Sequence, residues 1–375
     1  MLLAGQLLLE SADSPGHCQL VPGGLRLDGE LIAEVITDRM PWPYQLGGPE
    51  CLITPGFIDT HLHLPQFDII GAHGLPLLTW LDEVTFPAEM KWQDVEEARV
   101  LAARAVRQWF AHGTTALCAY ATVHHAATAA ALQVAADLGM RGVIGQVLMD
   151  RNAPPRLCRS AAQLIDETAD LLTRFPPHAR MAAAVTPRFA ISCTPELLAQ
   201  AGALATEHGA IVQTHLAETL PECARVQELF GGQSYVEVYR LAGLLSQRSI
   251  FGHGIHLDEH DQQQLAASGS VVAHCPTANQ FLGSGTMQRH ALLAAGVGIS
   301  LGSDIGAGYE RSMVRVARAM ILAAASLGDP PPAASAAWHT ITAGNADRLG
   351  WADAGRLRPG AIADLVVVRP NIPWL

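Results

Sequence analysis

The chain has 375 residues, of which 49% are hydrophobic and 16% are charged, so it can bury a large core and is too apolar for disorder. The 24 Lys and Arg residues against 35 Asp and Glu residues leave a net charge of −11. This balance argues against nucleic acid or an anionic membrane as the main partner. Seven cysteines are scattered singly, which predicts free thiols in a reducing cytoplasm.

Residues 1–54 carry short strand-like pieces, LLLES, LRLDG and LIAEVITD, broken by Gly, Pro and Asp. This pattern predicts a small β-structure rather than α/β repeats. The opening MLLAGQLLLE lacks a basic region and a small-residue cleavage site, so we interpret it as a strand rather than a signal peptide. No apolar stretch is long and unbroken enough to cross a bilayer. The strand-like tail predicts that residues 355–375 join residues 1–54 in one composite β domain.

From Pro55 the pattern changes, because short apolar runs alternate with longer segments of helical period. Eight strands alternating with helices over about 250 residues is the count of a (β/α)8 barrel, predicted here for residues 55–354. A doubly wound open sheet is the alternative, but no GxGxxG opens a helix after the first strand. The predicted strands are GFIDTHLHL, GTTALCAYA, RGVIGQVLM, RMAAAVTPRF, AIVQTHLAE, SIFGHG, SVVAHCP and GVGISLGSD. Helix candidates include VEEARVLAARAVRQWFAHG, AATAAALQVAADLGM and TPELLAQAGALATEHG.

Polar side chains stand at the ends of four predicted strands, where a barrel gathers its catalytic groups. A lone His-x-His is more often a pair of satisfied histidines, and a lone Ser-Asp is usually a turn or helix cap. Their joint occurrence at four strand ends instead predicts one metal site open to water, suited to zinc or iron(II). These residues are His61 and His63 on the first strand, His215 and Glu218 on the fifth, His253 on the sixth and Asp304 on the eighth.

PGFIDTHLHL, THLAE, GHG and GSD, in this order, resemble the amidohydrolase superfamily. The segments PLLTWLDEVTFPAE (residues 76–89), TPRFAISC (186–193), AHCPTANQFLGSG and SDIGAGYERSM are similar to the guanine deaminases of that superfamily. The likeness spans roughly residues 52–320, and the long 76–89 segment is its most specific part. Superfamily members with two metals commonly bridge them through a lysine on strand four. Here the only lysine is Lys91, before a helix, so the resemblance implies a mononuclear centre.

The resemblance implies a role for each residue of this site. Glu218, His253 and Asp304 would be the catalytic residues, with Glu218 moving protons and His253 polarising the attacking water. Glu218 read alone could equally be an acid at a helix N-terminus. One zinc ion per chain, with iron possible, would be bound by His61, His63, His215 and Asp304.

The purine would contact Gln66, Arg188 and Phe189, with Trp80 as a further candidate. The planar fork of Arg188 matches the acceptors O6 and N7 of guanine, although Arg188 could form a structural salt bridge instead. Phe189 and Trp80 offer apolar surface for a flat ring, and either could belong to the core.

The resemblance implies the hydrolytic deamination of guanine to xanthine and ammonia. The alternative enzyme is a deaminase or hydrolase of another heterocycle, of the 8-oxoguanine, cytosine or triazine type. From a different class, a catalytically dead metal-binding scaffold is disfavoured because no expected ligand is missing. The expected partner is a small purine, and a homodimer is predicted only by analogy with the family.

Overall fold

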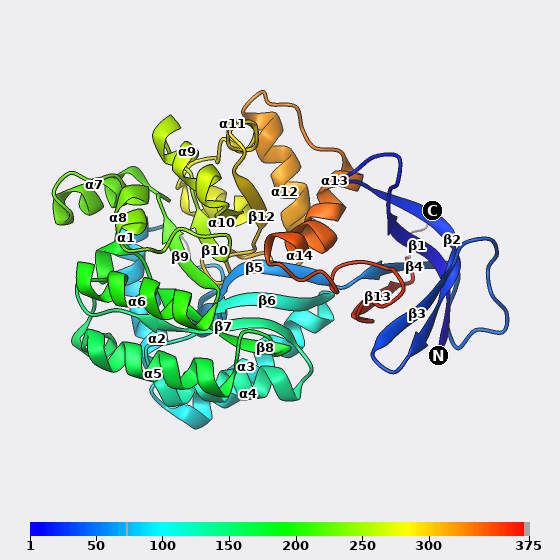
Figure 1. Cartoon of the computed structure of the whole chain (residues 1–375), viewed down its shortest axis with the longest axis horizontal. Coiled ribbons are helices and arrows are strands. Elements are labelled where there is room, and N and C mark those ends of the chain that lie inside the picture. The colour runs from blue at the N-terminus through cyan, green and yellow to red at the C-terminus, as the bar shows by residue number, and fades with distance from the viewer. Residues whose placement is uncertain (73, 371–375) are drawn as a thin grey trace.

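The computed structural model describes residues 1–72 and 74–370. Figure 1 shows a large α/β body beside a smaller sheet that contains both the blue N-terminal strands and the red β13. The predicted (β/α)8 barrel with a β-structure built from both termini is thereby confirmed.

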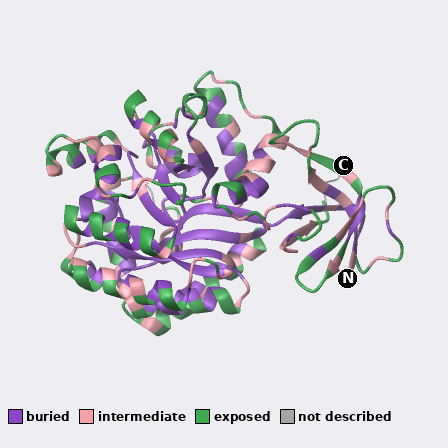
Figure 2. Cartoon of the chain, in the orientation of Figure 1, coloured by how far each residue is buried: buried purple, intermediate pink, exposed green. Residues whose placement is uncertain are grey.

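The barrel sheet has eight parallel strands in the order β12-β11-β10-β9-β8-β7-β6-β5. They coincide with the eight runs predicted from the sequence, and Figure 2 shows them buried at the centre of the body. Their bounds are β5 Phe57–His63, β6 Thr114–Tyr120, β7 Arg141–Leu148, β8 Met181–Pro187, β9 Val212–Leu216, β10 Ser249–His253, β11 Val271–His274 and β12 Gly298–Leu301.

Helices cover the barrel strands and expose their outer faces, coloured green in Figure 2. The longer helices are α3 Val95–Ala111, α4 His125–Asp137, α5 Ala161–Arg174, α6 Pro195–His208, α7 Leu220–Leu229, α9 Glu259–Ser268 and α12 Met313–Ser326. The shorter ones are α1 Leu77–Trp80, α2 Phe86–Lys91, α8 Tyr235–Leu241, α10 Pro276–Leu282, α11 Arg289–Ala294, α13 Ala334–His339 and α14 Asn345–Arg348. Short segments of other helix types are η1 Leu64–Ile69, η2 Leu81–Thr85, η3 Pro155–Leu157, η4 Ala190–Ser192 and η5 Thr340–Gly344.

Helix α6 illustrates how local sequence sets these elements. The Thr194 hydroxyl accepts a hydrogen bond from the Leu197 N–H at 3.2 Å and so caps the helix start. Gly209 ends the helix in the left-handed region, with φ 60°. These two residues are the first and last of the predicted helix segment TPELLAQAGALATEHG.

The smaller sheet has the order β13-β4-β1-β2-β3. Its strands are β1 Leu2–Glu10, β2 Cys18–Asp28, β3 Leu31–Ile36, β4 Leu46–Pro55 and β13 Leu365–Val368. Strand β13 pairs antiparallel with β4, so the end of the described chain completes a sheet begun at its start. The opening MLLAGQLLLE is a strand as predicted, whereas residues 371–375 of the predicted β domain lie outside the described residues.

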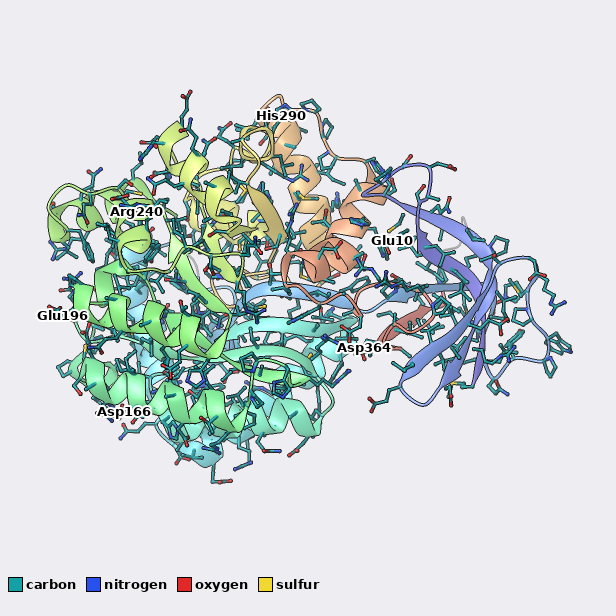
Figure 3. All side chains as sticks on the ribbon, in the orientation of Figure 1. Glu10, Asp166, Glu196, Arg240, His290 and Asp364 are labelled. Atoms are coloured by element: carbon teal, nitrogen blue, oxygen red, sulfur yellow. The ribbon has the colours of Figure 1, made fainter. Side chains whose placement is uncertain are left out.

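Ion pairs link the small sheet to the barrel. Arg180, beside β8, reaches Asp364 at 2.6 Å. Arg356 reaches Glu10 at 3.1 Å and Asp347 of α14 at 2.7 Å, so it joins β1 to the barrel body. Figure 3 places the labelled Glu10 and Asp364 between the two parts of the molecule. These ion pairs therefore hold the small sheet to the barrel in addition to the chain itself, which runs directly from β4 into β5.

Two further expectations concern thiols and membranes. All seven cysteines lie within the described residues and are free, and four of them are buried, Cys51, Cys118, Cys193 and Cys275. Across residues 1–72 and 74–370, the helices are too short or too polar to span a bilayer.

Candidate active site

The ends of β5, β9, β10 and β12 bring the predicted polar residues together. His63 Nε2 lies 3.4 Å from Asp304 Oδ1 and 3.1 Å from His215 Nε2, and His61 Nε2 lies 3.5 Å from the same Asp304 oxygen. Ligand atoms of His61, His215 and His253 also lie within 4.8 Å of one another. All of these side chains except that of His215 are fully buried.

This spacing fits a cation. Two ligands about 2.1 Å from one ion, at angles near 90–110°, lie roughly 3.0–3.4 Å apart. His61 Nε2 is buried and has no hydrogen-bond partner among the described residues, which is costly unless another group occupies that side. The donor set of three imidazoles and a carboxylate suits zinc or iron(II).

The tautomer of His215 is fixed by its surroundings. Its Nδ1 lies 2.6 Å from the backbone carbonyl oxygen of Arg188, which can only accept a hydrogen bond. Nδ1 therefore carries the proton, and the lone pair of Nε2 faces His63 and the centre of the cluster. Burial, followed by the fields of the neighbouring histidines, lowers the pKa of His215 well below its usual value. The imidazole is thus neutral and ready to bind a metal.

Backbone geometry explains the GHG and GSD motifs. His253 and Asp304 both occupy the left-handed region, with φ 73° and 52°, a conformation that costs energy and is concentrated at functional sites. Gly252 directly precedes His253, and Gly302 lies two residues before Asp304. Both glycines pack against His61. A Cβ on Gly252 would lie 2.5 Å from His61 Cε1, and one on Gly302 would lie 2.7 Å from His61 Cβ. Glycine is therefore required where these strands pass His61.

Glu218 lies in a buried, polar niche beside this cluster. Ser284 Oγ donates to its Oε1 at 2.7 Å, and its Oε2 lies 3.4 Å from His253 Nε2. Burial, and then the charges of Asp304 and Glu222, raise the pKa of Glu218 well above its usual value. The raised pKa favours the protonated carboxyl, the form in which Glu218 can act as a general acid.

Asn279 was not singled out as a site residue from sequence, although it lies in the AHCPTANQFLGSG segment. Its Nδ2 donates to His253 Nδ1 at 3.0 Å and faces Glu218 Oε1 at 3.5 Å. Because Nδ1 of His253 accepts, the proton of that imidazole is on Nε2, toward Glu218. Burial lowers the pKa of His253 to about 3, so the ring is neutral.

The four predicted purine contacts, Gln66, Trp80, Arg188 and Phe189, line one buried pocket together with His63, His215, Glu218, His253 and Asp304. Trp80 comes from α1, and its Nε1 donates to the Ala72 carbonyl at 2.9 Å. Leu77 and Leu81 of the same segment add apolar surface. The long 76–89 segment therefore forms one wall of the pocket.

Arg188 makes a buried ion pair that the sequence had left open as an alternative. Its Nη1 donates to both oxygens of Glu89, at 2.6 and 2.7 Å, and the ring of Phe86 lies 5.3 Å from its Cζ. Gln66 Nε2 also donates to Glu89 Oε1, at 3.0 Å. Arg188 is thus both paired and part of the pocket wall. Glu89 was missed as a site residue, and the sequence signal was its place at the end of the specific 76–89 segment.

Among residues 1–72 and 74–370, the remaining histidines are not part of the cluster. His125, on α4, pairs with Asp170 at 2.7 Å. His274 is buried at the end of β11, where its carbonyl accepts from Gly302 N–H at 3.0 Å. His256 is half-buried, with Nε2 3.1 Å from the Ser284 carbonyl oxygen.

Comparison with known proteins agrees with this geometry. Residues 52–373 match the sequence profile of the Amidohydrolase family. The chain belongs to the amidohydrolase family. Within it, the chain is 37% identical to the guanine deaminase of Escherichia coli (strain K12) over 323 residues, which cover 85% of this chain and 73% of that protein.

Solved structures of this family show the same likeness. An E. coli guanine deaminase superimposes with a TM-score of 0.92 at 32% identity, covering 98% of this chain and 89% of that one. A guanine deaminase from C. acetobutylicum, with guanine bound in its active site, gives a TM-score of 0.90 at 27% identity, covering 98% and 90%. The predicted resemblance to the guanine deaminases of the amidohydrolase family is thereby confirmed.

Proposed function

We propose that this amidohydrolase is a guanine deaminase, converting guanine and water to xanthine and ammonia. The observation that carries the proposal is the shared pocket: the candidate metal ligands and the predicted purine contacts Gln66, Arg188 and Phe189 line the same buried space. The likeness to guanine deaminases over most of the chain supports the choice of substrate.

His61, His63, His215 and Asp304 would hold one metal ion, zinc in our proposal, with iron(II) as the alternative. When bound, such an ion supplies Lewis acidity that makes water nucleophilic near neutral pH. Although burial opposes its charge, the contacts from His61 and His63 keep the pKa of Asp304 well below its usual value. Asp304 thus offers a carboxylate as a ligand.

Glu218 supplies the protons of the reaction. Water adds to the ring carbon that carries the amino group, so a ring nitrogen must gain a proton and the amine must leave as ammonia. The protonated Glu218 carboxyl can donate the first proton to the ring nitrogen, then take one proton from the attacking water and pass it to the leaving amine. As the carbonyl of xanthine forms, the added hydroxyl returns its remaining proton to Glu218, which restores the carboxyl. The Ser284 hydroxyl holds Oε1 during these transfers.

His253 orients the attacking water and the oxygen that develops from it. Its neutral ring presents Nε2–H beside Glu218, and Asn279 keeps the ring in that tautomer. A neutral donor of this kind stabilises negative charge on oxygen without competing for the proton of Glu218.

On the purine side, Arg188 provides donors and Phe189 and Trp80 provide flat apolar surface. Arginine donors suit O6 and N7 of guanine, and aromatic faces stack on a purine ring. The proposal also keeps a division into a barrel of residues 55–354 and a β domain of residues 1–54 and 355–375. It further includes a homodimer in the cytoplasm.

Ammonia release from a panel of guanine, 8-oxoguanine, cytosine and a triazine tests the proposal, with elemental analysis of the same protein. We expect turnover of guanine above the other rings and about one zinc per chain. Preference for another ring would assign the alternative hydrolase. Metal-loaded protein that releases no ammonia from any ring would overturn the proposed function and favour the catalytically dead scaffold.

A further inference from the structure

The Glu89 carboxylate lies at the centre of a buried polar cluster on the purine side of the pocket. It accepts hydrogen bonds from Arg188 Nη1 and from Gln66 Nε2. Glu89, Gln66 and Arg188 are 1%, 1% and 2% exposed. They come from α2, η1 and the end of β8, so three separate elements meet at one carboxylate.

Glu89 fixes which end of the Gln66 amide is available to a ligand. An ionised carboxylate only accepts hydrogen bonds, so the amide must turn its NH2 group toward Glu89. Its carbonyl oxygen, Oε1, is then left as an acceptor, and it is buried without a hydrogen-bond partner among the described residues. Such an atom is costly to bury alone and is satisfied when a ligand brings a donor.

Glu89 also orients the hydrogen-bond donors of Arg188. Both of its bonds from Arg188 come from the single nitrogen Nη1, which directs that end of the guanidinium at Glu89. Nη2 and Nε take no part in the contact with Glu89. The cluster therefore presents one oriented acceptor, from Gln66, and oriented donors, from Arg188.

We propose that Glu89 is a positioning residue that determines specificity for the oxo edge of the purine. It does so by holding Gln66 as an acceptor and Arg188 as a donor. The inference rests on the proposed function, because it concerns the substrate of that site. A six-membered ring with an oxo group and an adjacent N–H offers one acceptor and one donor side by side. This matches the polarity of the cluster.

Glu89→Gln is the sharpest variant because it changes polarity and hardly changes volume. The new amide would turn its oxygen to Arg188 and its NH2 group to Gln66. Gln66 would then flip and present NH2 to the ligand where it had presented oxygen. A merely structural salt bridge would lose stability on this change, but its loss would not alter which ligand edge is preferred.

Binding of two purines that cannot be deaminated gives a readout independent of turnover. Hypoxanthine carries the oxo group and the adjacent N–H, whereas unsubstituted purine carries neither. In metal-loaded wild-type protein we expect hypoxanthine to bind about 10-fold or more tighter than purine by isothermal titration calorimetry, as expected for hydrogen bonds involving a charged group. In Glu89→Gln the two dissociation constants should fall within about 3-fold of each other.

Two variants bracket the result. Glu89→Asp keeps a carboxylate and should retain the preference for hypoxanthine. Asp353→Asn removes the carboxylate of a different arginine pair, in which Arg141 contacts Asp353 at 2.8 and 3.1 Å, and should leave the preference unchanged. If Glu89→Gln does not fold, Gln66→Met removes the acceptor while leaving the pair of Glu89 and Arg188. The same loss of preference is then expected.

The outcomes separate this inference from the proposed function. Wild-type protein that releases no ammonia from guanine overturns the proposed function. Wild-type protein that deaminates guanine, while Glu89→Gln or Gln66→Met keeps the wild-type preference for hypoxanthine, overturns only the role of Glu89.

Discussion

The carboxylate of Asp59 accepts two hydrogen bonds from Ser303, one from its hydroxyl at 2.5 Å and one from its backbone N–H at 2.9 Å. Asp59 lies in β5 and Ser303 follows β12, the first and last strands of the barrel sheet. Next to Ser303, the Asp304 N–H donates to the His61 carbonyl at 2.8 Å. These contacts close the barrel between β5, which carries the candidate ligands His61 and His63, and the segment after β12, which carries the candidate ligand Asp304.

Replacing Asp59 by alanine should weaken metal binding. The variant leaves the Ser303 donors unsatisfied and frees Asp304 to shift, so we expect about 10–100-fold lower zinc affinity. Stability should also fall by about 1–3 kcal/mol per unsatisfied buried donor. Competition with a chromophoric chelator measures the affinity, and urea denaturation measures the stability.

Ser300→Ala is the matched control for this prediction. Ser300 Oγ and Thr60 Oγ1 form a 2.9 Å hydrogen bond across the same junction of β5 and β12, but neither residue adjoins Asp304. We expect zinc affinity within about 3-fold of wild type in this variant. Equal zinc affinities in Asp59→Ala and Ser300→Ala would show that the Asp59 contact does not position the ligands.

Glu218→Gln should keep the metal and lose turnover. The amide preserves the shape and the Ser284 contact but cannot donate and accept the transferred proton, so kcat should fall by about 10²–10⁴-fold. Elemental analysis checks that the metal is kept, and steady-state ammonia release checks that turnover is lost. Ser284→Ala, which only frees Glu218 Oε1, should cost less, about 3–10-fold. Wild-type rates in Glu218→Gln would assign the proton transfer elsewhere.

The sequence predicted the eight strands and the metal-site cluster because both depend on regular patterns. Strand runs are short and apolar, and the ends of parallel barrel strands meet at one face. His61, His63 and His215 stand at such ends, so their convergence follows from chain order alone. The same reasoning reached Glu218, three residues past His215, because the reaction needs an acid beside the metal.

Glu89 could not be derived in that way. It meets Arg188 from 99 residues away in sequence, across a helix in an irregular segment that no periodicity places. Asp59 had a weak signal that went unused, since a carboxylate inside the buried run FIDTHLH needs a partner. Its partner Ser303 lies 244 residues away, and only the closure of the barrel brings the two together.

Arg188→Ala should raise the KM for guanine and destabilise the fold together. Loss of the guanidinium removes donors from the pocket, expected to raise KM by about 10–100-fold. It also leaves Glu89 buried and unpaired, which costs about 3–5 kcal/mol when one partner of a buried pair is removed. Steady-state kinetics and urea denaturation separate the two effects. An unchanged KM would place Arg188 outside the substrate pocket.

The double variant Arg188→Ala with Glu89→Ala serves as the control for the stability effect. It removes the uncompensated carboxylate, so part of the lost stability should return. The KM should stay high, because the donors remain absent. A double variant as unstable as the single one would mean that the unpaired charge is not the source of the loss.

Buried His274 should make the protein less stable in acid. Burial, with a smaller contribution from Arg289, lowers its pKa to about 3, against a value near 6.5 in the unfolded chain. Between these values the unfolded chain binds a proton that the folded chain does not. The stability due to the neutral ring is therefore complete above about pH 6.5 and is lost as pH falls toward about 3. In His274→Gln this dependence disappears, so the difference in unfolding free energy between wild type and variant should change by about 1.4 kcal/mol per pH unit. Urea midpoints from pH 4 to 7 measure this change in the difference.

His290→Gln serves as the control. This residue lies at an exposed position near the edge of the barrel body in Figure 3, and the variant should follow the wild-type curve. Parallel curves for wild type and His274→Gln would mean that His274 titrates alike in both states.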